Sequence, residues 1–357
     1  MIKVLVVDDS AFMRNTLVSI LQKSPNINVV ATGRNGEEGL ELIQKHDPDV
    51  VTLDIEMPRM DGLTALKRIM MEMPRPVIMI SSLTTEGAEA TLKALELGAA
   101  DFIPKQTLPD EAYGENIRET VLTVAKSSHI FRRFRRPRPV VPVKVPPLSA
   151  PVAAPSALTS PRGPLGSRPA RDVVAIGVST GGPPAVQKIL SALPEDFPAG
   201  ILIAQHMPAA FTQTFAKRLD SVSKISVKEA EPGDKLRNGW AYVAPGGKHI
   251  RVKPNMEIIV SEEPKEALYK PSANELMDSV GKTFGRKALG VMLTGMGNDG
   301  LNGAKVLKAG GGRLIAQSEQ TCVVYGMPKA VVDAGLADEV IDLDNMAQAI
   351  IDNLYIR

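Results

Sequence analysis

The chain has 357 residues, of which 44% are hydrophobic, and this length is enough for two ordinary domains with separate cores. The 42 basic and 40 acidic residues nearly balance, and we find neither a membrane-spanning apolar run nor an N-terminal signal pattern. A single cysteine excludes an internal disulfide framework, and the four widely separated histidines give no zinc-binding spacing. We therefore expect a cytoplasmic protein that does not insert into membranes.

The first half of the chain alternates short apolar runs with amphipathic stretches. The apolar runs have the length and composition of buried strands, and a helical pattern follows each of them, the last after Leu108. Five strand–helix units predict a flavodoxin-like (βα)5 domain, which is a doubly wound parallel sheet with its ligand sites at the carboxyl ends of the strands. The expected strands are Lys3–Val7, Asn28–Ala31, Val50–Leu53, Val77–Ile80 and Asp101–Ile103.

Polar side chains stand where these strands are expected to end. Asp8 and Asp9 end the first strand, Asp54 ends the third, Ser81 ends the fourth, and Lys105 follows the fifth. Three carboxylates on one edge repel one another unless a cation joins them, and oxygen ligands with open water positions suit Mg²⁺. A lysine beside them can balance the charge of a phosphoryl group. A lone aspartate before a helix is more often a helix cap, but that alternative does not explain the full set.

These strand ends carry the motifs of a known family. Val6-Val7-Asp8-Asp9-Ser10, the stretch LDIEMPRMDG at residues 53–62, and Ile103-Pro104-Lys105 resemble the signature of response-regulator receiver domains of two-component systems. The resemblance implies phosphorylation on Asp54. It also implies a Mg²⁺ site formed by Asp8, Asp9, Asp54 and the carbonyl of Glu56, phosphoryl contacts from Ser81 and Lys105, and an aromatic switch at Phe102. Gln106 departs from the family pattern, because many receivers have proline after the lysine.

A basic, proline-rich segment follows this half. Between His129 and Arg171 the sequence has nine basic residues, no acidic ones and ten prolines, whereas 33 basic and 40 acidic residues remain elsewhere. Such a composition predicts an extended tether rather than a packed core. We therefore expect a receiver domain at 1–128, a linker at 129–171 and a catalytic domain at 172–357. The arginines are either a solvated basic linker, which is the simpler interpretation, or a docking patch for an acidic partner.

The second half opens with a strand–turn–helix pattern. The apolar run Val173-Val174-Ala175-Ile176 leads into Gly177-Val178-Ser179-Thr180-Gly181-Gly182, which fits the nucleophile pattern G-x-S-x-G. This geometry exposes the Ser179 hydroxyl beside backbone N–H groups that can hold a developing oxyanion. A turn of this composition can also cradle a phosphate or simply cap a helix.

The remaining elements predict a second doubly wound, mostly parallel α/β sheet. Ile201–Ala204 and Ala288–Leu293 have strand patterns, and helices are expected after Pro208, at Asn274–Phe284 and from Asp344 to about Leu354. Three short alternating runs are expected to add antiparallel hairpins to the sheet. These runs are Gly239–Ala244, Lys248–Val252 and Glu257–Val260.

Two more strand ends carry reactive residues. His206 follows the second strand of this half, and Asp299 lies in a glycine-rich turn after a later strand. Ser179 as nucleophile, His206 as base and Asp299 as the group that orients the imidazole form a plausible triad at one sheet edge. Its chain order differs from the Ser, Asp, His order of α/β-hydrolases. His249 is a competing base within an expected hairpin, and Cys322 is a competing nucleophile better explained as a buried, inert thiol.

The motifs of this half resemble the catalytic domain of the chemotaxis methylesterase family, CheB. They are GVSTGGP at 177–183, QHMP at 205–208, APGG at 244–247, TGMGNDG at 294–300 and YGMP at 325–328. The resemblance implies a cytoplasmic hydrolase that demethylates glutamate γ-methyl esters on chemoreceptors and also deamidates glutamines, without a cofactor at the esterase site. It implies a kinase of the chemotaxis pathway as phosphodonor. It puts Ser179, His206 and Asp299 in the triad, and Thr180 and Met296 near the oxyanion.

Two other functions fit parts of the sequence less well. A receiver can precede a DNA-binding domain, but this half has strand-end motifs and no basic recognition helix, so we expect no nucleic-acid partner. A phosphate-binding module could use the Ser179 turn, but the P-loop lysine is missing. Neither alternative gives His206 and Asp299 a role. We also expect the unphosphorylated receiver to cover the esterase cleft, because the tether gives the receiver a high effective concentration near it.

Overall fold

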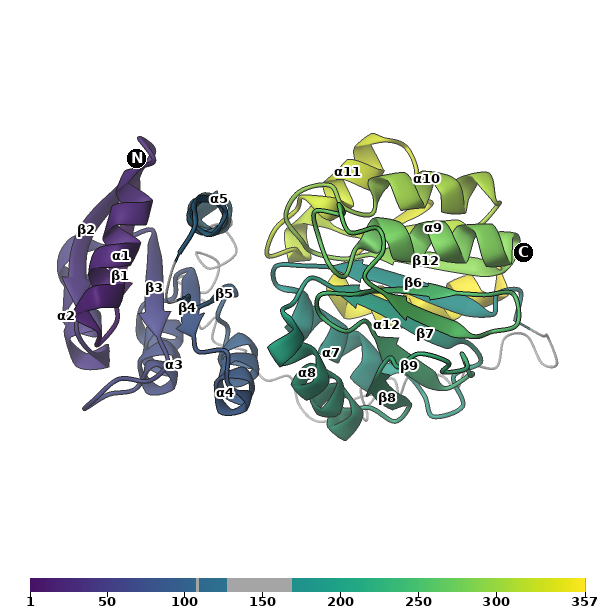
Figure 1. The fold of residues 1–357 in the computed structure, drawn as a ribbon, viewed down its shortest axis with the longest axis horizontal. Helices are drawn as coiled ribbons and strands as arrows, with labels where there is room; N and C mark the ends of the chain where they lie inside the picture. The colour runs from purple at the N-terminus through teal and green to yellow at the C-terminus, as the bar shows by residue number, and fades with distance from the viewer. Residues whose placement is uncertain (107–108, 127–168, 357) are drawn as a thin grey trace, which may run out of the picture.

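The computed structural model describes residues 1–106, 109–126 and 169–356, and it contains two parallel sheets, one in each half of the chain (Figure 1). The expected linker lies outside these residues except for its last part. In the described parts of the chain, no helix is long and apolar enough to cross a membrane.

The N-terminal half forms the predicted five-stranded sheet. All of its strand pairs are parallel, and their order is β2-β1-β3-β4-β5. The central strands β3 and β4 are buried along their whole length, as their unbroken apolar runs require. The strands are β1 (Ile2–Val7), β2 (Ile27–Gly33), β3 (Val50–Asp54), β4 (Val77–Ser81) and β5 (Asp101–Pro104).

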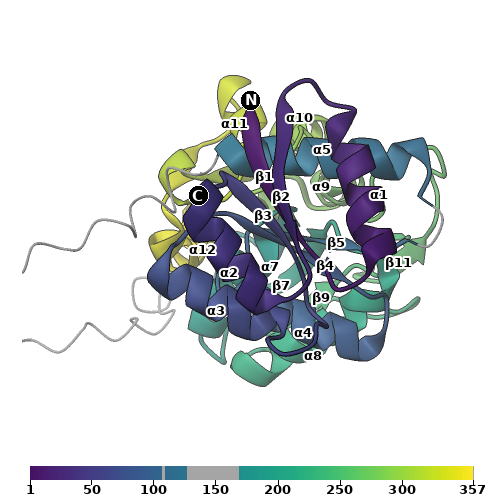
Figure 2. The same ribbon diagram turned by 90° about the vertical axis from the view of Figure 1, so that its left-hand side faces the viewer.

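Five helices cover the two faces of this sheet (Figure 2). Residues of α1 and α5 pack on one face, and residues of α2, α3 and α4 pack on the other. Polar side chains cap the first four helices: Ser10, Asn35, Asp61 and Thr84 each accept a hydrogen bond from an amide of the first turn. The helices are α1 (Ala11–Gln22), α2 (Gly36–His46), α3 (Gly62–Glu72), α4 (Thr85–Glu96) and α5 (Glu111–Lys126).

The C-terminal half forms a seven-stranded sheet in the order β14-β13-β12-β6-β7-β9-β8. Every neighbouring pair in it is parallel. The strands are β6 (Val173–Val178), β7 (Gly200–Gln205), β8 (Ser226–Glu229), β9 (Trp240–Val243), β12 (Ala288–Met292), β13 (Arg313–Gln317) and β14 (Glu339–Ile341). The predicted fold class, a mostly parallel sheet with an antiparallel hairpin, is confirmed.

One strand prediction is wrong in its direction. The run Gly239–Ala244 was expected in an antiparallel hairpin, but β9 lies between β7 and β8 and is parallel to both. Only β10 (His249–Val252) and β11 (Ile258–Ser261) pair antiparallel among the described strands, and they form a separate two-stranded sheet. Short strands with glycine-rich turns fit either direction, and β9 is almost fully buried, as parallel strands usually are.

The C-terminal half also has two layers of helices around its sheet. Buried residues of α7, α8 and α12 pack on one face, and those of α9, α10 and α11 pack with the β10–β11 hairpin on the other. The helices are α7 (Gly182–Ala192), α8 (Ala209–Val222), α9 (Ala273–Phe284), α10 (Leu301–Ala309), α11 (Met327–Asp333) and α12 (Leu343–Tyr355), with short 3-10 turns η1 (Gly285–Lys287) and η2 (Glu319–Thr321).

Arg171 differs from the role expected of the linker arginines. It is 4% exposed, and its guanidinium donates to the carbonyls of Asn353 and Ile356 at the end of α12. The amides of Ala170 and Arg171 donate to the carbonyl of Leu354. Arg171 is therefore neither a solvated linker residue nor part of a docking patch, because it fixes the C-terminal helix. The other eight basic residues of this stretch lie outside the described residues.

The two halves meet along one face of the N-terminal sheet and its helices, with α4, β5 and α5 turned toward the C-terminal half (Figure 1). Helix α4 packs against α7 and α8. The ring centroids of Phe102 in β5 and Phe211 in α8 lie 4.7 Å apart. Glu96 of α4 forms an ion pair with Arg218 of α8, with 2.6 Å between the carboxylate oxygen and the guanidinium nitrogen. Apolar and charged contacts thus join the two domains.

Candidate active site

Ser179 stands in the turn between β6 and α7, as predicted. Its amide donates to the carbonyl of Thr294 at 3.0 Å, and Gly181 ends the turn with a φ of 74°, a conformation that favours glycine. Gly295 packs directly against the serine: a Cβ at this position would lie 2.8 Å from the Ser179 Cβ. The turn therefore depends on glycines both within it and beside it.

His206 directly follows β7, the strand next to β6. Its amide donates to the carbonyl of Val178 at 3.1 Å, which ties the two strand ends together. The buried Gln205 side chain donates to the carbonyl of Ser179 at 3.0 Å and to that of His206 at 3.1 Å. One amide thus holds the backbones of both residues in register.

Asp299 lies between β12 and α10, and β12 borders β6 on its other side. Its carboxylate accepts hydrogen bonds from the Ser272 hydroxyl at 2.8 Å, from the Ala273 amide at 2.6 Å and from the Asn274 amide at 3.2 Å, at the beginning of α9. Burial opposes ionisation here, but hydrogen bonds from His206 and Ser272 hold the pKa of Asp299 below its usual value. These hydrogen bonds therefore favour the ionised form of Asp299 and fix the orientation of its carboxylate.

These three side chains form one continuous hydrogen-bonded chain. The Nδ1 atom of His206 lies 3.1 Å from the Ser179 Oγ, and its Nε2 atom lies 2.8 Å from the Asp299 Oδ2. An ionised carboxylate can only accept, so Nε2 carries the proton and Nδ1 is left as the acceptor for the serine hydroxyl. The imidazole is turned around relative to the serine proteases, in which Nε2 faces the serine. The three hydrogen-bonded side chains have the arrangement of an activated serine nucleophile.

A cleft of about 670 Å³ opens in front of Ser179 and His206, and both domains line it. Thr180 and Met296, which the resemblance puts near the oxyanion, are among its lining residues. The Thr180 hydroxyl donates to the Asp101 carboxylate of the receiver at 2.5 Å. The receiver thus already binds the hydroxyl of Thr180, one of the two residues expected near the oxyanion.

His249 and Cys322, the alternative base and nucleophile, do not take part in the hydrogen bonds that join Ser179, His206 and Asp299. His249 is 1% exposed within β10, and burial lowers its pKa; it is His206 that bonds to Ser179. The Cys322 thiol is 2% exposed, and burial raises its pKa to about 12, so it is not a thiolate at neutral pH. The interpretation of Cys322 as a buried thiol is confirmed.

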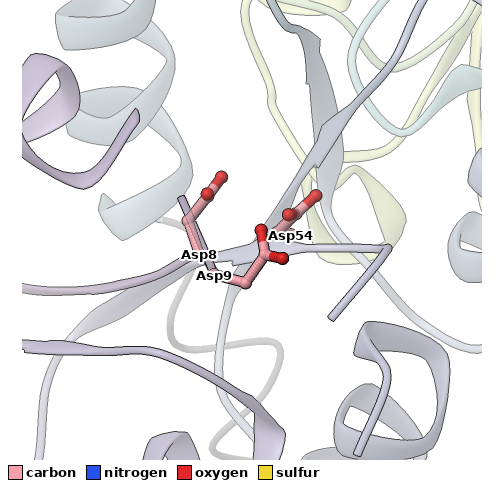
Figure 3. A group of neighbouring side chains, drawn as sticks. All are labelled: Asp8, Asp9 and Asp54. Carbon is pink, nitrogen blue, oxygen red and sulfur yellow. The ribbon is translucent and has the colours of Figure 1, made fainter. Parts of the chain in front are cut away.

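The receiver site lies at the carboxyl ends of β1 and β3 (Figure 3). Carboxylate oxygens of Asp8, Asp9 and Asp54 all lie within 4.8 Å of one another; Asp8 and Asp54 are buried, and Asp9 is exposed. The Lys105 ammonium lies 2.7 Å from the Asp54 Oδ2 and 3.2 Å from the Asp8 Oδ2. Burial raises the pKa of Asp54 to about 6. Gathered carboxylate oxygens fit a hard divalent cation, so these residues suit Mg²⁺.

Three other predicted residues have different surroundings. The Ser81 hydroxyl is fully buried and bonds within the receiver, donating to the Gly87 carbonyl and accepting from the Thr91 hydroxyl at 2.6 Å. Phe102 lies against Phe211 of the catalytic half. The Glu56 side chain is exposed in the turn after β3. Of the expected phosphoryl contacts, Lys105 therefore reaches Asp54, and Ser81 bonds to α4 instead.

Several residues that contact the site were not predicted from the sequence. Gln205, Ser272 and Tyr269 touch members of the hydrogen-bonded chain, and Asp101 binds Thr180. Gln205 precedes His206 and is the one polar residue of an otherwise apolar strand. A polar residue in such a strand is expected to be buried and to need hydrogen-bond partners, and this was the one usable signal in the sequence. Tyr269 and Ser272 lie far from the triad in the sequence, and nothing in their local pattern indicates where the loop folds.

Comparisons with known proteins agree for both halves. A CheB methylesterase family model matches residues 174–350, and a response regulator receiver domain model matches residues 4–113. A protein-glutamate methylesterase/protein-glutamine glutaminase of Oleidesulfovibrio alaskensis is 64% identical over 99% of this chain and 100% of its own length. One of Nitratidesulfovibrio vulgaris is 65% identical with the same coverage.

Among solved structures, the CheB methylesterase catalytic domain of Thermotoga maritima matches 51% of this chain and 98% of its own length, with 40% identity and a TM-score of 0.49. The two full-length relatives match both domains and the segment between them. By these full-length matches, the chain belongs to the CheB family of protein-glutamate methylesterases/protein-glutamine glutaminases that carry a response-regulator receiver domain.

Proposed function

We propose that this chain is a cytoplasmic, phosphorylation-regulated hydrolase that removes methyl groups from glutamate γ-methyl esters on chemoreceptors, and so serves sensory adaptation. The observation that carries this proposal is the hydrogen-bonded chain from Asp299 through His206 to Ser179 at the edge of the sheet. The names of the full-length relatives supply the substrate class. The proposed domains are a receiver at 1–128, a tether at 129–171 and an esterase at 172–357.

The proposed reaction has two halves. Ser179 Oγ attacks the ester carbonyl while His206 Nδ1 takes its proton, and Asp299 stabilises the resulting imidazolium. The tetrahedral intermediate collapses, and methanol leaves with the proton from Nδ1. Water then attacks the acyl-enzyme and loses a proton to Nδ1. Nδ1 passes this proton to Ser179 Oγ as the acyl bond breaks, which releases glutamate and restores the serine hydroxyl. Backbone amides in the Ser179–Gly182 turn and at Met296 are the proposed oxyanion donors.

The same machinery accounts for a glutaminase activity. A glutamine side chain presents a carbonyl of nearly the same shape, and the leaving group is ammonia instead of methanol. Because an amide nitrogen must be protonated before it leaves, proton donation by His206 matters more for glutamine than for the ester. We therefore propose that both reactions use Ser179, His206 and Asp299, with no cofactor at this site.

The regulatory part of the proposal rests on the contacts of β5. Asp54 is the proposed phosphorylation site, and a sensor histidine kinase of the chemotaxis pathway is the proposed phosphodonor. Asp8, Asp9, Asp54 and the Glu56 carbonyl would hold Mg²⁺, which offsets the charge of the phosphoryl group. Lys105 would then exchange its carboxylate partners for phosphoryl oxygens, and Ser81 would have to leave Thr91 to reach them.

Phosphorylation is proposed to release the receiver from the cleft. Lys105 directly follows β5, and the same strand carries Asp101, bonded to Thr180, and Phe102, packed on Phe211. A change of partner at Lys105 therefore acts on a strand whose other end contacts the residue next to the nucleophile. The expected consequence is a weaker interface and a more accessible Ser179.

The test of the esterase proposal is methanol release from a methylated receptor cytoplasmic fragment. Ser179→Ala should lower the rate by a factor on the order of 10³ or more, because it removes the nucleophile. Ser191→Ala, an exposed serine on α7, is the matched control and should leave the rate at the wild-type value. Near-normal hydrolysis by Ser179→Ala would rule out the proposed mechanism.

A further inference from the structure

A short segment before α9 contacts two members of the hydrogen-bonded chain. The Tyr269 ring stacks on the His206 imidazole with the ring centroids 4.3 Å apart and the planes inclined by only 8°. Three residues later, the Ser272 hydroxyl donates to Asp299. Between them, the Lys270 carbonyl accepts a hydrogen bond from the Gly247 amide at 3.0 Å, which anchors the segment to the loop after β9.

We propose that Tyr269 is a positioning residue for His206: its ring holds the imidazole in the plane of Ser179 and Asp299 and stabilises the positive charge that the imidazole acquires. This inference rests on the proposed function, because it assigns a role in the same reaction. The residue acts through His206 and needs no contact with the reacting atoms.

The Tyr269 ring limits how the His206 imidazole can turn. A histidine ring turns easily about its terminal torsion, for which the energy wells are broad. The two nitrogens of His206 reach Ser179 Oγ and Asp299 Oδ2 together only in one ring plane. Because Tyr269 covers one face of the imidazole in a nearly parallel arrangement, a rotation out of that plane would drive the imidazole edge into the tyrosine ring. The stack therefore restricts His206 to its reactive orientation.

The Tyr269 ring also affects the charge of the His206 imidazole. Two neutral rings prefer offset or edge-to-face packing, whereas a cation is attracted to the negatively charged face of an aromatic ring within about 6 Å. The stacked ring thus interacts better with an imidazolium than with a neutral imidazole. Burial raises the pKa of the Tyr269 hydroxyl, so the phenol stays neutral at physiological pH and brings no competing charge.

Other ionisable groups share this environment and must be held constant in a test. Asp299 faces His206 directly, Lys270 comes from the same segment as Tyr269, and the remaining ones come from the receiver. The receiver groups that line the cleft are Asp101, Glu115 and Glu119. Variants of Tyr269 leave all of these groups in place, so a change in the pH profile can be traced to the ring.

The experiment measures kcat and KM for methanol release across pH in the full-length chain, with Tyr269→Leu and Tyr269→Phe. Leucine keeps an apolar side chain at this position but loses the aromatic face, so we expect kcat to fall roughly 10- to 100-fold with KM within about threefold of the wild type. The acidic limb of kcat/KM should move to lower pH by about half a unit, because the imidazolium loses stabilisation. Phenylalanine should keep kcat within about threefold and retain the wild-type profile.

Two outcomes would overturn the inference. A Tyr269→Leu chain with the wild-type kcat and acidic limb would show that the ring has no positioning role. Equal losses in Tyr269→Phe and Tyr269→Leu would assign the effect to the hydroxyl. Thermal unfolding checks that each variant folds, and Tyr269→Met replaces the leucine variant if that one does not. The Ser179→Ala result is independent: if that chain still hydrolyses the ester, the proposed function fails, whatever the Tyr269 variants do.

Discussion

At the scale of single residues, the Asp299 carboxylate carries two tasks at once. It accepts a hydrogen bond from His206 Nε2, and it also accepts hydrogen bonds from the first amide of α9 and from the Ser272 hydroxyl. A carboxylate at the beginning of a helix is stabilised by the helix dipole and by unpaired amides. The helix therefore keeps Asp299 ionised and fixed, and Asp299 in turn fixes the tautomer of His206.

Replacing Asp299 by asparagine separates charge from shape. The asparagine side chain could present either an oxygen or an amide group to His206, and it cannot stabilise an imidazolium, so we expect kcat to fall by a factor on the order of 10⁴. Methanol release with Asp299→Asn checks this, and the exposed Asp196→Asn is the matched control. A loss of less than about tenfold would mean that His206 does not depend on this carboxylate.

The sequence allowed Ser179, His206 and Asp299, the three hydrogen-bonded residues, to be predicted together because each one follows a strand. Strand ends can be predicted from apolar runs, and parallel strands bring their carboxyl ends to one edge. Tyr269 and Ser272 could not be predicted, because they belong to a loop that reaches the site only after the whole domain has folded. Thr180 was assigned to the oxyanion site, and its hydrogen bond to Asp101 of another domain has no local sequence signal.

At the scale of secondary-structure elements, β5 links the two sites of the molecule. Lys105, at its carboxyl end, contacts Asp8 and Asp54, and Asp101, at its beginning, contacts Thr180. The strand is only four residues long and is paired on one side with β4. A backbone shift near Lys105 is therefore expected to move Asp101 at the other end of this short strand.

We expect the Asp101 contact to make the interface sensitive to pH. Burial raises the pKa of Asp101 to about 6, above the usual value of an aspartate. An acid that binds its proton more tightly in the docked state favours docking below that pKa, so docking should strengthen as pH falls through 6 and weaken as it rises. Small-angle scattering of the unphosphorylated chain at about pH 5.5 and about pH 8, values chosen to flank this pKa, should show the more compact form at low pH.

The Asp101→Asn variant supplies the comparison. It keeps a hydrogen-bonding side chain without a titratable group, so its dimensions should be the same at both pH values. Glu41→Gln, which removes an exposed carboxyl on α2, should retain the wild-type response. A pH response that survives in Asp101→Asn would assign the effect to another group.

The elements of the fold were predictable to different degrees. The five receiver strands were predicted to within a few residues, because unbroken apolar runs mark buried parallel strands. The direction of β9 was predicted wrongly, since the connection of ten residues from β8 contains no helix that would signal a parallel crossover. Strands β8, β13 and β14 were not predicted at all; β8 and β14 are short and only partly buried.

At the scale of the whole molecule, the receiver stands over the esterase cleft. The Glu96–Arg218 ion pair, the Phe102–Phe211 contact and the Asp101–Thr180 hydrogen bond lie along one face, formed by α4 and β5. The ion pair alone adds little, because an ion pair that is partly exposed contributes about 0–1 kcal/mol. An interface of this kind can hold the receiver in place and still yield to a modest change at Asp54.

The measurement that tests this account most directly is methanol release by the intact chain with and without a small phosphodonor, at constant Mg²⁺. We predict a rate that rises with the phosphodonor in the wild type and does not respond in Asp54→Asn, with Ser179→Ala inactive in both conditions. A Ser179-dependent rate that is the same with and without the phosphodonor, or a full response in Asp54→Asn, would contradict the claim that phosphorylation of the receiver controls this site.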